Sequence, residues 1–342
     1  MAYAWSSQPA AKNEIRLEDD RPVWCVSDIH LGNGSHSDIF MRKDAFLLEL
    51  LAQVRQSGAR LVVVGDAIDF HQSWNLTRIV EAHGPLLRAL SDLADTNGVI
   101  YVTGNHDDDI NVYRDILRFR VCSRLWIGES IAIQHGHEFD PVIGPDMAGS
   151  HRATRIHHWV EDRLHTFIRL PLGDFYNVGN RFGIWLAYQI WRAVSLRNQG
   201  LRRLGFNELA ARSERIYTHW IRSEVGDPVG MTRPALSWAA SHGVKTVICG
   251  HSHMPGNLVH EGVRYCNTGS WTFNWAQYLR YEGGEFTVKD WISGREYRDE
   301  LYRPLLDGDL DHLDFDRWWR NQYLGWFRYR TGELRRELGV SK

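Results

Sequence analysis

The sequence has no long apolar run, few cysteines and almost no lysine. No stretch approaches the roughly 20 apolar residues that a membrane-spanning helix needs, and the polar segment 1–20 does not resemble a secretion signal. The four cysteines form no C-x-x-C pair, which argues against a zinc knuckle or a redox motif. A net charge of −2 argues against a partner that is a nucleic-acid polymer. We therefore expect a cytoplasmic protein with buried, reduced thiols.

The residues that are abundant indicate a metal site and an amphipathic surface. The chain has 342 residues, of which 43% are hydrophobic and 24% charged, enough for a large buried core. It carries 17 histidines and 15 tryptophans, and 35 of its 40 basic residues are arginine. Abundant histidine raises the expectation of metal binding. Tryptophan and arginine suit contact surfaces as well as cores.

Short apolar runs alternate with helical spacing in two parts of the chain, and this alternation predicts an α/β sandwich. Residues 1–20 are expected to be a loose leader. Helices are expected over 43–57 and 78–94. Strands are expected over 22–27, 61–64, 99–102, 131–133, 246–249, 263–266 and 286–288.

The stretch from 141 to 240 lacks strand signals and has helical spacing throughout. Residues 151–225 contain twelve arginines, six acidic residues and no lysine. The predicted helices also carry Trp159, Trp185, Trp191 and Trp220, and such a composition favours a lid that faces a lipid substrate or a membrane surface. Plain packing of helix against helix is the alternative. The predicted organisation is therefore a core over 1–140 and 241–294, a helical insertion over 141–240, and an aromatic, arginine-rich C-terminal arm over 295–342.

Five predicted strands each end in a polar cluster. Functional groups gather beyond the carboxyl ends of strands in α/β sheets, so we expect these clusters to meet. They offer carboxylate, amide and imidazole ligands without a thiolate, a set that suits Mn²⁺, Fe or Zn²⁺. The clusters are Ser27-Asp28-Ile29-His30, Gly65-Asp66-Ala67-Ile68-Asp69, Gly104-Asn105-His106-Asp107, His135-Gly136-His137 and Gly250-His251-Ser252-His253.

In this order the clusters D-x-H, G-D-x-x-D, G-N-H-D, H-G-H and G-H-x-H resemble the signature of the calcineurin-like metallophosphoesterases. The resemblance implies a four-layer αββα sandwich with two divalent metal ions. The ligand types make Mn²⁺ the expected ion, with Fe or Zn²⁺ as the alternatives. It implies that Asp28, His30 and His253 bind one ion. It implies that Asn105, His135 and His251 bind the other ion, and that Asp66 bridges the two.

The same resemblance implies that His106 is the catalytic imidazole and that Asp107 orients it. Two metal ions about 3.5–4 Å apart activate water and neutralise phosphoryl charge, and a carboxylate can bridge them. An imidazole beside the scissile bond can donate a proton to the leaving oxygen. Asp69, His137 and Asp140 lie close in sequence, where they either hydrogen-bond to ligand histidines or cap turns.

Within this superfamily the pattern resembles the branch of the UDP-2,3-diacylglucosamine hydrolases, although that branch usually has arginine at the position of His106. The resemblance implies a phosphorylated or nucleotide-linked lipid as substrate, cleavage of its pyrophosphate, and peripheral contact with the inner membrane. Two alternatives remain: a soluble phosphodiesterase of small nucleotides, and a scaffold that has lost catalysis. The complete ligand set argues against the scaffold.

Overall fold

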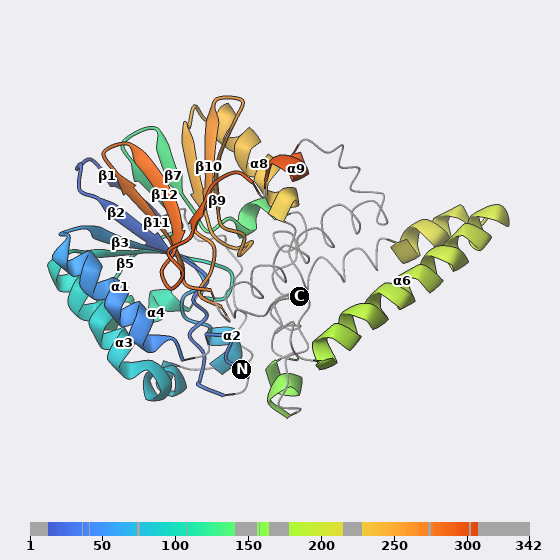
Figure 1. Cartoon of the computed structure of the whole chain (residues 1–342), viewed down its shortest axis with the longest axis horizontal. Coiled ribbons are helices and arrows are strands. Elements are labelled where there is room, and N and C mark those ends of the chain that lie inside the picture. Colours follow the sequence, from blue (N-terminus) through green and yellow to red (C-terminus); the bar gives the residue numbers. More distant parts are fainter. Residues whose placement is uncertain are drawn as a thin grey trace, which may run out of the picture.

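Two β-sheets packed face to face form the centre of the molecule in the computed structural model of the chain (Figure 1). Helices cover the outer face of each sheet, so the order of layers is helix, sheet, sheet, helix. The predicted αββα sandwich is therefore confirmed. The structure describes residues 13–306 except for 36, 41, 74–75, 108, 141–155, 157, 164–177, 215–227, 273–274 and 301.

The larger sheet has seven strands, and its central part is parallel. Strands β2 to β5 pair side by side in the parallel sense, whereas β11, β12 and β13 extend the sheet in the antiparallel sense. In spatial order the strands are β13 (Glu296–Tyr297), β12 (Glu285–Asp290), β11 (Gln277–Glu282), β2 (Val23–Val26), β3 (Arg60–Val64), β4 (Val99–Val102) and β5 (Arg120–Cys122).

The smaller sheet has six strands and is mixed. Strand β8 lies at its centre and pairs in the parallel sense with β7 and β10, while β6 with β7 and β9 with β10 are antiparallel. In spatial order the strands are β1 (Glu14–Leu17), β6 (Arg124–Ile127), β7 (Ile131–Ile133), β8 (Thr246–Cys249), β10 (Val263–Asn267) and β9 (Gly256–His260).

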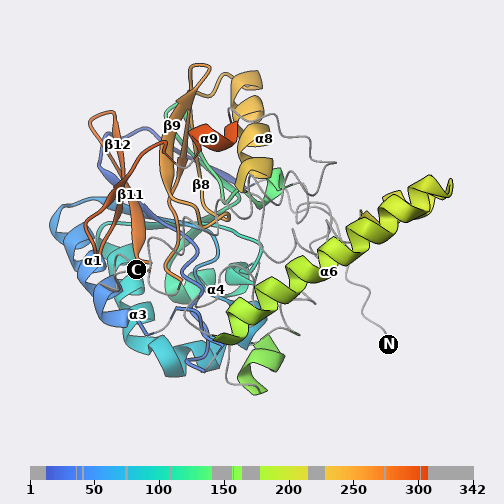
Figure 2. The ribbon, with the colours of Figure 1, turned by 45° about the vertical axis from the view of Figure 1, so that its right-hand side comes forward.

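Helices α1, α3 and α4 cover the seven-stranded sheet, and α8 and α9 cover the six-stranded sheet (Figures 1 and 2). The short helices α2 and η1 follow β3 and β7, at the ends of the strands where the polar clusters lie. The bounds are α1 (Asp44–Gln56), α2 (Phe70–Ser73), α3 (Leu76–Thr96), α4 (Ile110–Leu117), η1 (His137–Phe139), α6 (Val178–Arg203), α8 (Pro228–Ser241) and α9 (Arg303–Leu306).

Alternating side chains of the central strands fill two apolar layers at once. In β2, Trp24 and Val26 pack toward α1 and α3, whereas Val23 and Cys25 pack between the sheets. Side chains alternate across a strand, so a strand buried on both faces has a continuous apolar sequence. This is why short runs such as Arg60–Val64 are apolar along almost their whole length.

The predicted strands and core helices are confirmed, with one correction at the N-terminus. Residues 14–17 are not part of a loose leader, because they form β1 and pair with β6. Ile15 and Leu17 pack between the sheets. The strand has only four residues, so its alternation of polar and apolar side chains is too short to be recognised in the sequence. All four cysteines are buried and free, as expected. Within the described helices, none is long and apolar enough to cross a membrane.

The described part of the insertion contains two kinds of helix. Residues 228–240, which the sequence pattern assigned to the insertion, belong to α8, and Met231, Ala235 and Ala239 pack against the six-stranded sheet. By contrast, α6 projects away from both sheets (Figure 2). The side chains of Trp185 and Trp191, the residue Trp220 and the arm beyond 306 lie outside the described part.

Candidate metal centre

The five polar clusters lie at the carboxyl ends of β2, β3, β4, β7 and β8, so both sheets contribute to one site. Six of the seven predicted ligands are buried, and the seventh, His251, is half-buried. Ligand atoms of the site form groups compact enough to hold an ion. Two of these groups are Asp28, His30 and His253, and Asp66, His135 and His251.

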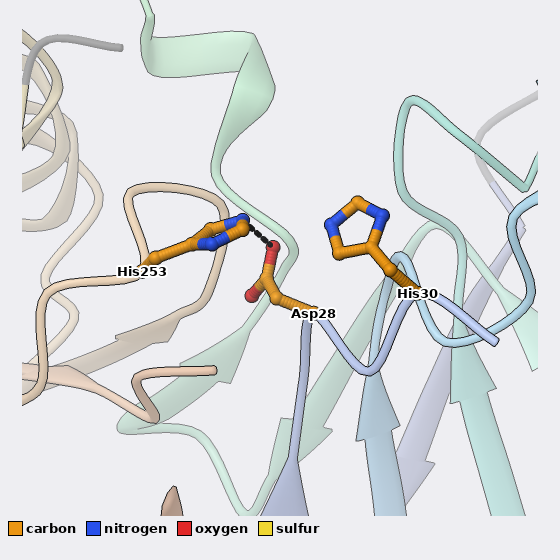
Figure 3. A group of neighbouring side chains, drawn as sticks. All are labelled: Asp28, His30 and His253. Atoms are coloured by element: carbon orange, nitrogen blue, oxygen red, sulfur yellow. Dashed lines mark ion pairs between the residues drawn. The ribbon is translucent and has the colours of Figure 1, made fainter. Parts of the chain in front are cut away.

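The first group joins the loop after β2 to the loop after β8. Asp28 lies between the two imidazoles, which approach it from opposite sides (Figure 3). His253 Nε2 lies 3.2 Å from Asp28 Oδ1, and the centres of the His30 and His253 rings are 5.3 Å apart. The backbone N–H of His251 donates to Asp28 Oδ2 at 3.0 Å, which fixes the carboxylate from a segment 223 residues away in sequence.

The second group gathers around Asp66. His135 Nε2 lies 3.2 Å from Asp66 Oδ2 and also 3.2 Å from Asn105 Oδ1. The other ring nitrogen, His135 Nδ1, lies 2.8 Å from the carbonyl oxygen of Val64. A metal-binding histidine usually uses one nitrogen for the ion and hydrogen-bonds through the other, so this arrangement leaves Nε2 for an ion.

The residues present fit a pair of divalent ions. His30 shows this directly: its Nδ1 lies 3.2 Å from Asp69 Oδ2, and its Nε2 is buried without a hydrogen-bond partner in the described part of the chain. A buried polar atom without a partner is costly, and an ion supplies the missing partner. The donors are carboxylate, amide and imidazole groups, which match Mn²⁺, Fe and Zn²⁺.

Backbone strain is concentrated at the same residues. Among the described residues, eight that are not glycine have a positive φ, and five of them are predicted ligands. Their φ values lie between 49° and 64°, in the left-handed region that costs energy for residues with a Cβ. Strain of this kind persists where the surrounding structure imposes it, and it aims the side chains into the site. The five ligands are Asp28, His30, Asp66, His251 and His253.

Two glycines of the clusters lie so close to carboxylate side chains that no larger residue would fit. A Cβ at Gly104 would overlap Asp66 Oδ1, and a Cβ at Gly250 would overlap Asp28 Oδ2 and the side chain of Ser27. Any larger residue would push a predicted ligand out of place. The glycines of G-N-H-D and G-H-S-H therefore make room for carboxylates from other loops, that of Asp66 after the adjacent strand β3 and that of Asp28 after β2 of the other sheet.

Charges in the site are balanced between carboxylates and imidazoles. Burial opposes ionisation of Asp28 and Asp66, but neighbouring imidazoles, His253 for Asp28 and His135 for Asp66, outweigh it and lower both pKa values. Burial likewise opposes protonation of His135, yet Asp66 and Asp28 raise its pKa to about 10. Such strongly perturbed groups in one place are typical of functional sites.

Asp69 is the carboxylate that faces the predicted catalytic imidazole. His106 Nδ1 lies 3.5 Å from Asp69 Oδ1, and His30 Nδ1 reaches the other oxygen. Burial alone would raise the pKa of Asp69, but His106 and further imidazoles outweigh it and hold the pKa well below the ordinary carboxyl range. A second imidazole, that of His71 on α2, stacks at a tilt against His106 with ring centres 5.0 Å apart.

Asp107 anchors the G-N-H-D loop to its surroundings. Its carboxylate accepts hydrogen bonds from the Tyr101 hydroxyl at 2.6 Å and from the backbone N–H of Gly104 at 2.6 Å and Ala67 at 3.1 Å. Burial and the nearby Asp66 raise the pKa of Asp107 to about 7. The contacts of Asp107 are therefore with the loops around β3 and β4, and it is Asp69 that lies beside the imidazole of His106.

Asp140 and His137 lie on the side of the second group. His251 Nε2 lies 3.0 Å from Asp140 Oδ2, a pairing that orients an imidazole. The ring of His137 lies between 5 and 7 Å from two ligand rings, with centroid distances of 5.5 Å to His135 and 6.3 Å to His251. Burial lowers the pKa of His137 to about 4, so this imidazole is neutral at ordinary pH.

Two imidazoles near the site were not expected from the sequence. His158, in a short helix over residues 158–163, lies with Nε2 3.7 Å from Asp69 Oδ2 and is 3% exposed. Nothing near His158 resembles the strand-end clusters, so no sequence signal pointed to it. His71 was also missed, although its position two residues after Asp69 could have suggested it.

Comparisons with known proteins agree with this geometry. The family model for calcineurin-like phosphoesterases matches residues 21–255. No curated protein matches the chain. Similar solved structures include a predicted phosphoesterase from Streptococcus pneumoniae TIGR4, at 13% identity, covering 79% of this chain and 88% of that one, with a TM-score of 0.32.

Two further structures show the same low level of similarity. The phosphoesterase Yfce from E. coli is 16% identical, covers 80% of this chain and 96% of its own, and gives a TM-score of 0.37. The cold-active protein-tyrosine phosphatase of a psychrophile Shewanella species is 12% identical, covers 84% and 82%, and gives 0.36. The assignment therefore rests on the family model, which spans most of the chain: the protein belongs to the calcineurin-like phosphoesterase family and is a hydrolase acting on phosphoester bonds.

Proposed function

We propose that this hydrolase uses two Mn²⁺ ions to cleave the pyrophosphate of a nucleotide-linked lipid such as UDP-2,3-diacylglucosamine. The observation that carries the metal part is the pair of compact ligand groups at the joined strand ends. Asp28, His30 and His253 would hold one ion, and His135, His251 and Asn105 the other. Asp66, buried beside His135, is the carboxylate that would be shared.

When bound, the two ions would supply an activated water and would neutralise charge on the phosphoryl oxygens. The residues of the chain have separate tasks. His106 is the proton donor to the leaving oxygen. Its imidazole belongs to the G-N-H-D loop beside the site, and the side chain is 15% exposed, so a substrate can reach it. Asp69 Oδ1 faces His106 Nδ1 at 3.5 Å and would orient the ring, which leaves Nε2 for the substrate.

The helical hairpin of the insertion supports a lipid-linked substrate. Side chains of α6 bond to the helix over 207–214, Arg197 to Ser213 and Arg202 to Glu214, and Asn198 and Ala210 of the two helices are buried. At the turn between them, Leu204 is 74% and Phe206 57% exposed. Arg202 and Arg203 lie beside them, and residues 190–214 carry five arginines against two glutamates.

Exposed apolar side chains flanked by arginine suit the boundary of an anionic membrane. The apolar side chains enter the headgroup region, and the guanidinium groups pair with phosphates. In both views the turn lies at the end of the hairpin that points away from the sheets (Figures 1 and 2). We propose that the turn attaches the enzyme to the inner membrane, where a lipid-linked substrate is found.

A hydrolysis assay with added Mn²⁺ tests the substrate. UDP-2,3-diacylglucosamine, bis-p-nitrophenyl phosphate and a small cyclic nucleotide are compared by kcat/KM. We expect the lipid to be the best substrate by at least about 10²-fold, because remote binding energy is used in the transition state. In H₂¹⁸O, label in the released UMP marks attack at the phosphorus next to uridine. A preference for the cyclic nucleotide contradicts the lipid proposal and favours the small-nucleotide phosphodiesterase.

Vesicle co-sedimentation tests the membrane contact. Binding to vesicles with anionic lipid is expected at low salt, weaker at high salt, and absent for the double variant Leu204→Asp/Phe206→Asp. Ile116→Asp on α4 is the matched control, because Ile116 is also an exposed apolar residue but lies on the core. Equal loss of binding in the control, or no binding at low salt, contradicts the proposed membrane contact.

A further inference from the structure

The helix over residues 158–163 buries a histidine and a glutamate and exposes a tryptophan. His158 and Glu161 are buried, whereas Trp159, between them in sequence, is 63% exposed. Residues three and four apart lie on the same face of a helix, so His158, Glu161 and Asp162 form one polar face toward the core. A surface helix usually buries its apolar face, and this reversal calls for a partner that is itself polar.

The polar partner is the carboxylate of Asp69. His158 Nε2 lies 3.7 Å from Asp69 Oδ2, the oxygen that also lies 3.2 Å from His30 Nδ1. On the other oxygen, the backbone N–H of Gln72 donates to Asp69 Oδ1 at 2.9 Å, and His106 Nδ1 lies 3.5 Å away. Asp69 is thus surrounded by three imidazoles, of which one comes from the insertion and two from the strand-end loops.

A second route links the same helix to Asp69. The carboxylate of Asp162 accepts a hydrogen bond from the backbone N–H of Ser37 at 3.0 Å. The hydroxyl of Ser37 accepts from Gln72 Nε2 at 2.9 Å, and Gln72 is the residue whose N–H holds Asp69. The helix therefore reaches Asp69 both directly, through His158, and through Asp162, Ser37 and Gln72.

We propose that His158 is a positioning residue of the catalytic centre: supplied by the insertion, it fixes the carboxylate of Asp69, which in turn holds the imidazole of His106. This inference rests on the proposed role of His106 as proton donor. A carboxylate held on both oxygens keeps one orientation, and the ring that it supports keeps its aim at the leaving oxygen. The catalytic centre is complete only when the 158–163 helix is docked.

The first test compares His158→Ala and His158→Gln with wild type on phosphodiesters and Mn²⁺. We expect the alanine variant to lose about 10–100-fold in kcat with KM changed less than about 2-fold, since misplacement of a reacting group affects the chemical step. Glutamine keeps a donor near Asp69 and is expected to recover most of the rate. His260→Gln, at an exposed histidine on β9, is the matched control and is expected to match wild type.

The second test is a double-mutant cycle with His106→Ala. If His158 acts through His106, His158→Ala has little further effect once His106 is absent. Equal losses in both backgrounds, an effect on KM alone, or loss of bound metal overturns the proposal. A rate unchanged in the alanine variant also overturns it.

A readout independent of turnover separates this inference from the proposed function. Imidazole ¹⁵N signals of the metal-free chain report the surroundings of each ring. His158→Gln is expected to shift the signals of His30 and His106, which share Asp69, and to leave that of His260 in place. Unshifted signals overturn the inference even in an active enzyme, whereas a wild type without Mn²⁺-dependent hydrolysis contradicts the proposed function alone.

Discussion

Helix α3 of the core and the 158–163 helix of the insertion bury opposite kinds of side chain. In α3, Leu86, Leu87, Leu90 and Leu93 are buried against the seven-stranded sheet, and most of the polar residues face outward. In the 158–163 helix, Trp159 faces outward and His158 and Glu161 face inward. The core helix is stabilised by burial of apolar surface, and this hydrophobic effect does not require particular partner atoms in a particular geometry. The insertion helix is held by polar contacts, which require particular partners.

The core sandwich provides the stability of the molecule, whereas the insertion helix contributes to the geometry of the site. Substitutions in the core sandwich are expected to change the free energy of unfolding, because its apolar layers are continuous. Substitutions on the polar face of the 158–163 helix are expected to change the orientation of catalytic side chains. The catalytic centre lies at the junction of these two regions.

The largest effect is expected at the shared carboxylate. Asp66→Ala should abolish hydrolysis and reduce bound metal from two equivalents to less than one, because both predicted ions use this ligand. Metal content is measured by elemental analysis after supplementation with Mn²⁺. Asp115→Ala on the exposed face of α4 is the control and should retain both ions. An Asp66→Ala protein that keeps two equivalents would show that the ligand set is different.

His106→Ala is expected to lower kcat by about 10²–10⁴-fold while metal content stays near two equivalents. The reason is loss of proton donation to the leaving oxygen. The loss should therefore be smaller for p-nitrophenolate, which leaves without help, than for an alkoxide. Rates measured on a series of leaving groups decide this, and a uniform loss across the series would mean that His106 orients the phosphate instead.

A matched pair of truncations tests the comparison of the two helices directly. Leu90→Ala in α3 should reduce the free energy of unfolding by about 2–5 kcal/mol, because it leaves a cavity in the apolar layer. Trp159→Ala removes a larger side chain but should cost less than about 0.5 kcal/mol, since that side chain is exposed. Urea unfolding measures both values. A large cost for Trp159→Ala would show that its ring is buried in solution.

A stability effect that depends on pH is expected at the kink of α3, where His83 lies between two carboxylates. His83 Nδ1 is 2.8 Å from Asp44 Oδ1 and Nε2 is 3.2 Å from Asp38 Oδ2. Burial would lower the pKa of His83, but the two carboxylates outweigh it and raise the pKa to about 9.

A histidine whose pKa is raised in the folded state stabilises the protein fully below its unfolded pKa of about 6.5. This contribution is lost as the pH rises from there through about 9. His83→Gln should therefore cost on the order of 1–2 kcal/mol at pH 6 and clearly less at pH 9.5. The measurement is urea unfolding of both proteins at the two pH values. A cost that does not change with pH would mean that His83 is neutral throughout.

The strand-end site could be predicted because its signals are local. Each cluster directly follows a short apolar run, and the topology of parallel strands brings such ends together without further information. Asp28, Asp66 and His135 therefore lie where the sequence pattern indicated. The edge strands were harder: β1 has half of its side chains in solvent, so Glu14–Leu17 shows too little apolar character to be recognised.

The contribution of the insertion could not be predicted for a physical reason. His158 reaches Asp69 through tertiary docking of a helix, and no periodicity in the sequence encodes which polar face will turn inward. The helical spacing left open whether Trp159 packs against another helix or faces away from the protein, and in the structure its side chain is exposed. Similarly, the helical spacing of 228–240 did not distinguish a helix packed on the sheet from one in the insertion.

The origin of the ligands in two different sheets has a mechanical consequence. Asp28 and His30 follow β2 of the seven-stranded sheet, whereas His253 follows β8 of the six-stranded one; the second group is divided in the same way between Asp66 and His135. An ion in either group would tie the two halves of the sandwich together at one edge. The sheets could then separate only after the ion had dissociated. Bound metal would therefore lower the rate of unfolding and give the protein kinetic stability.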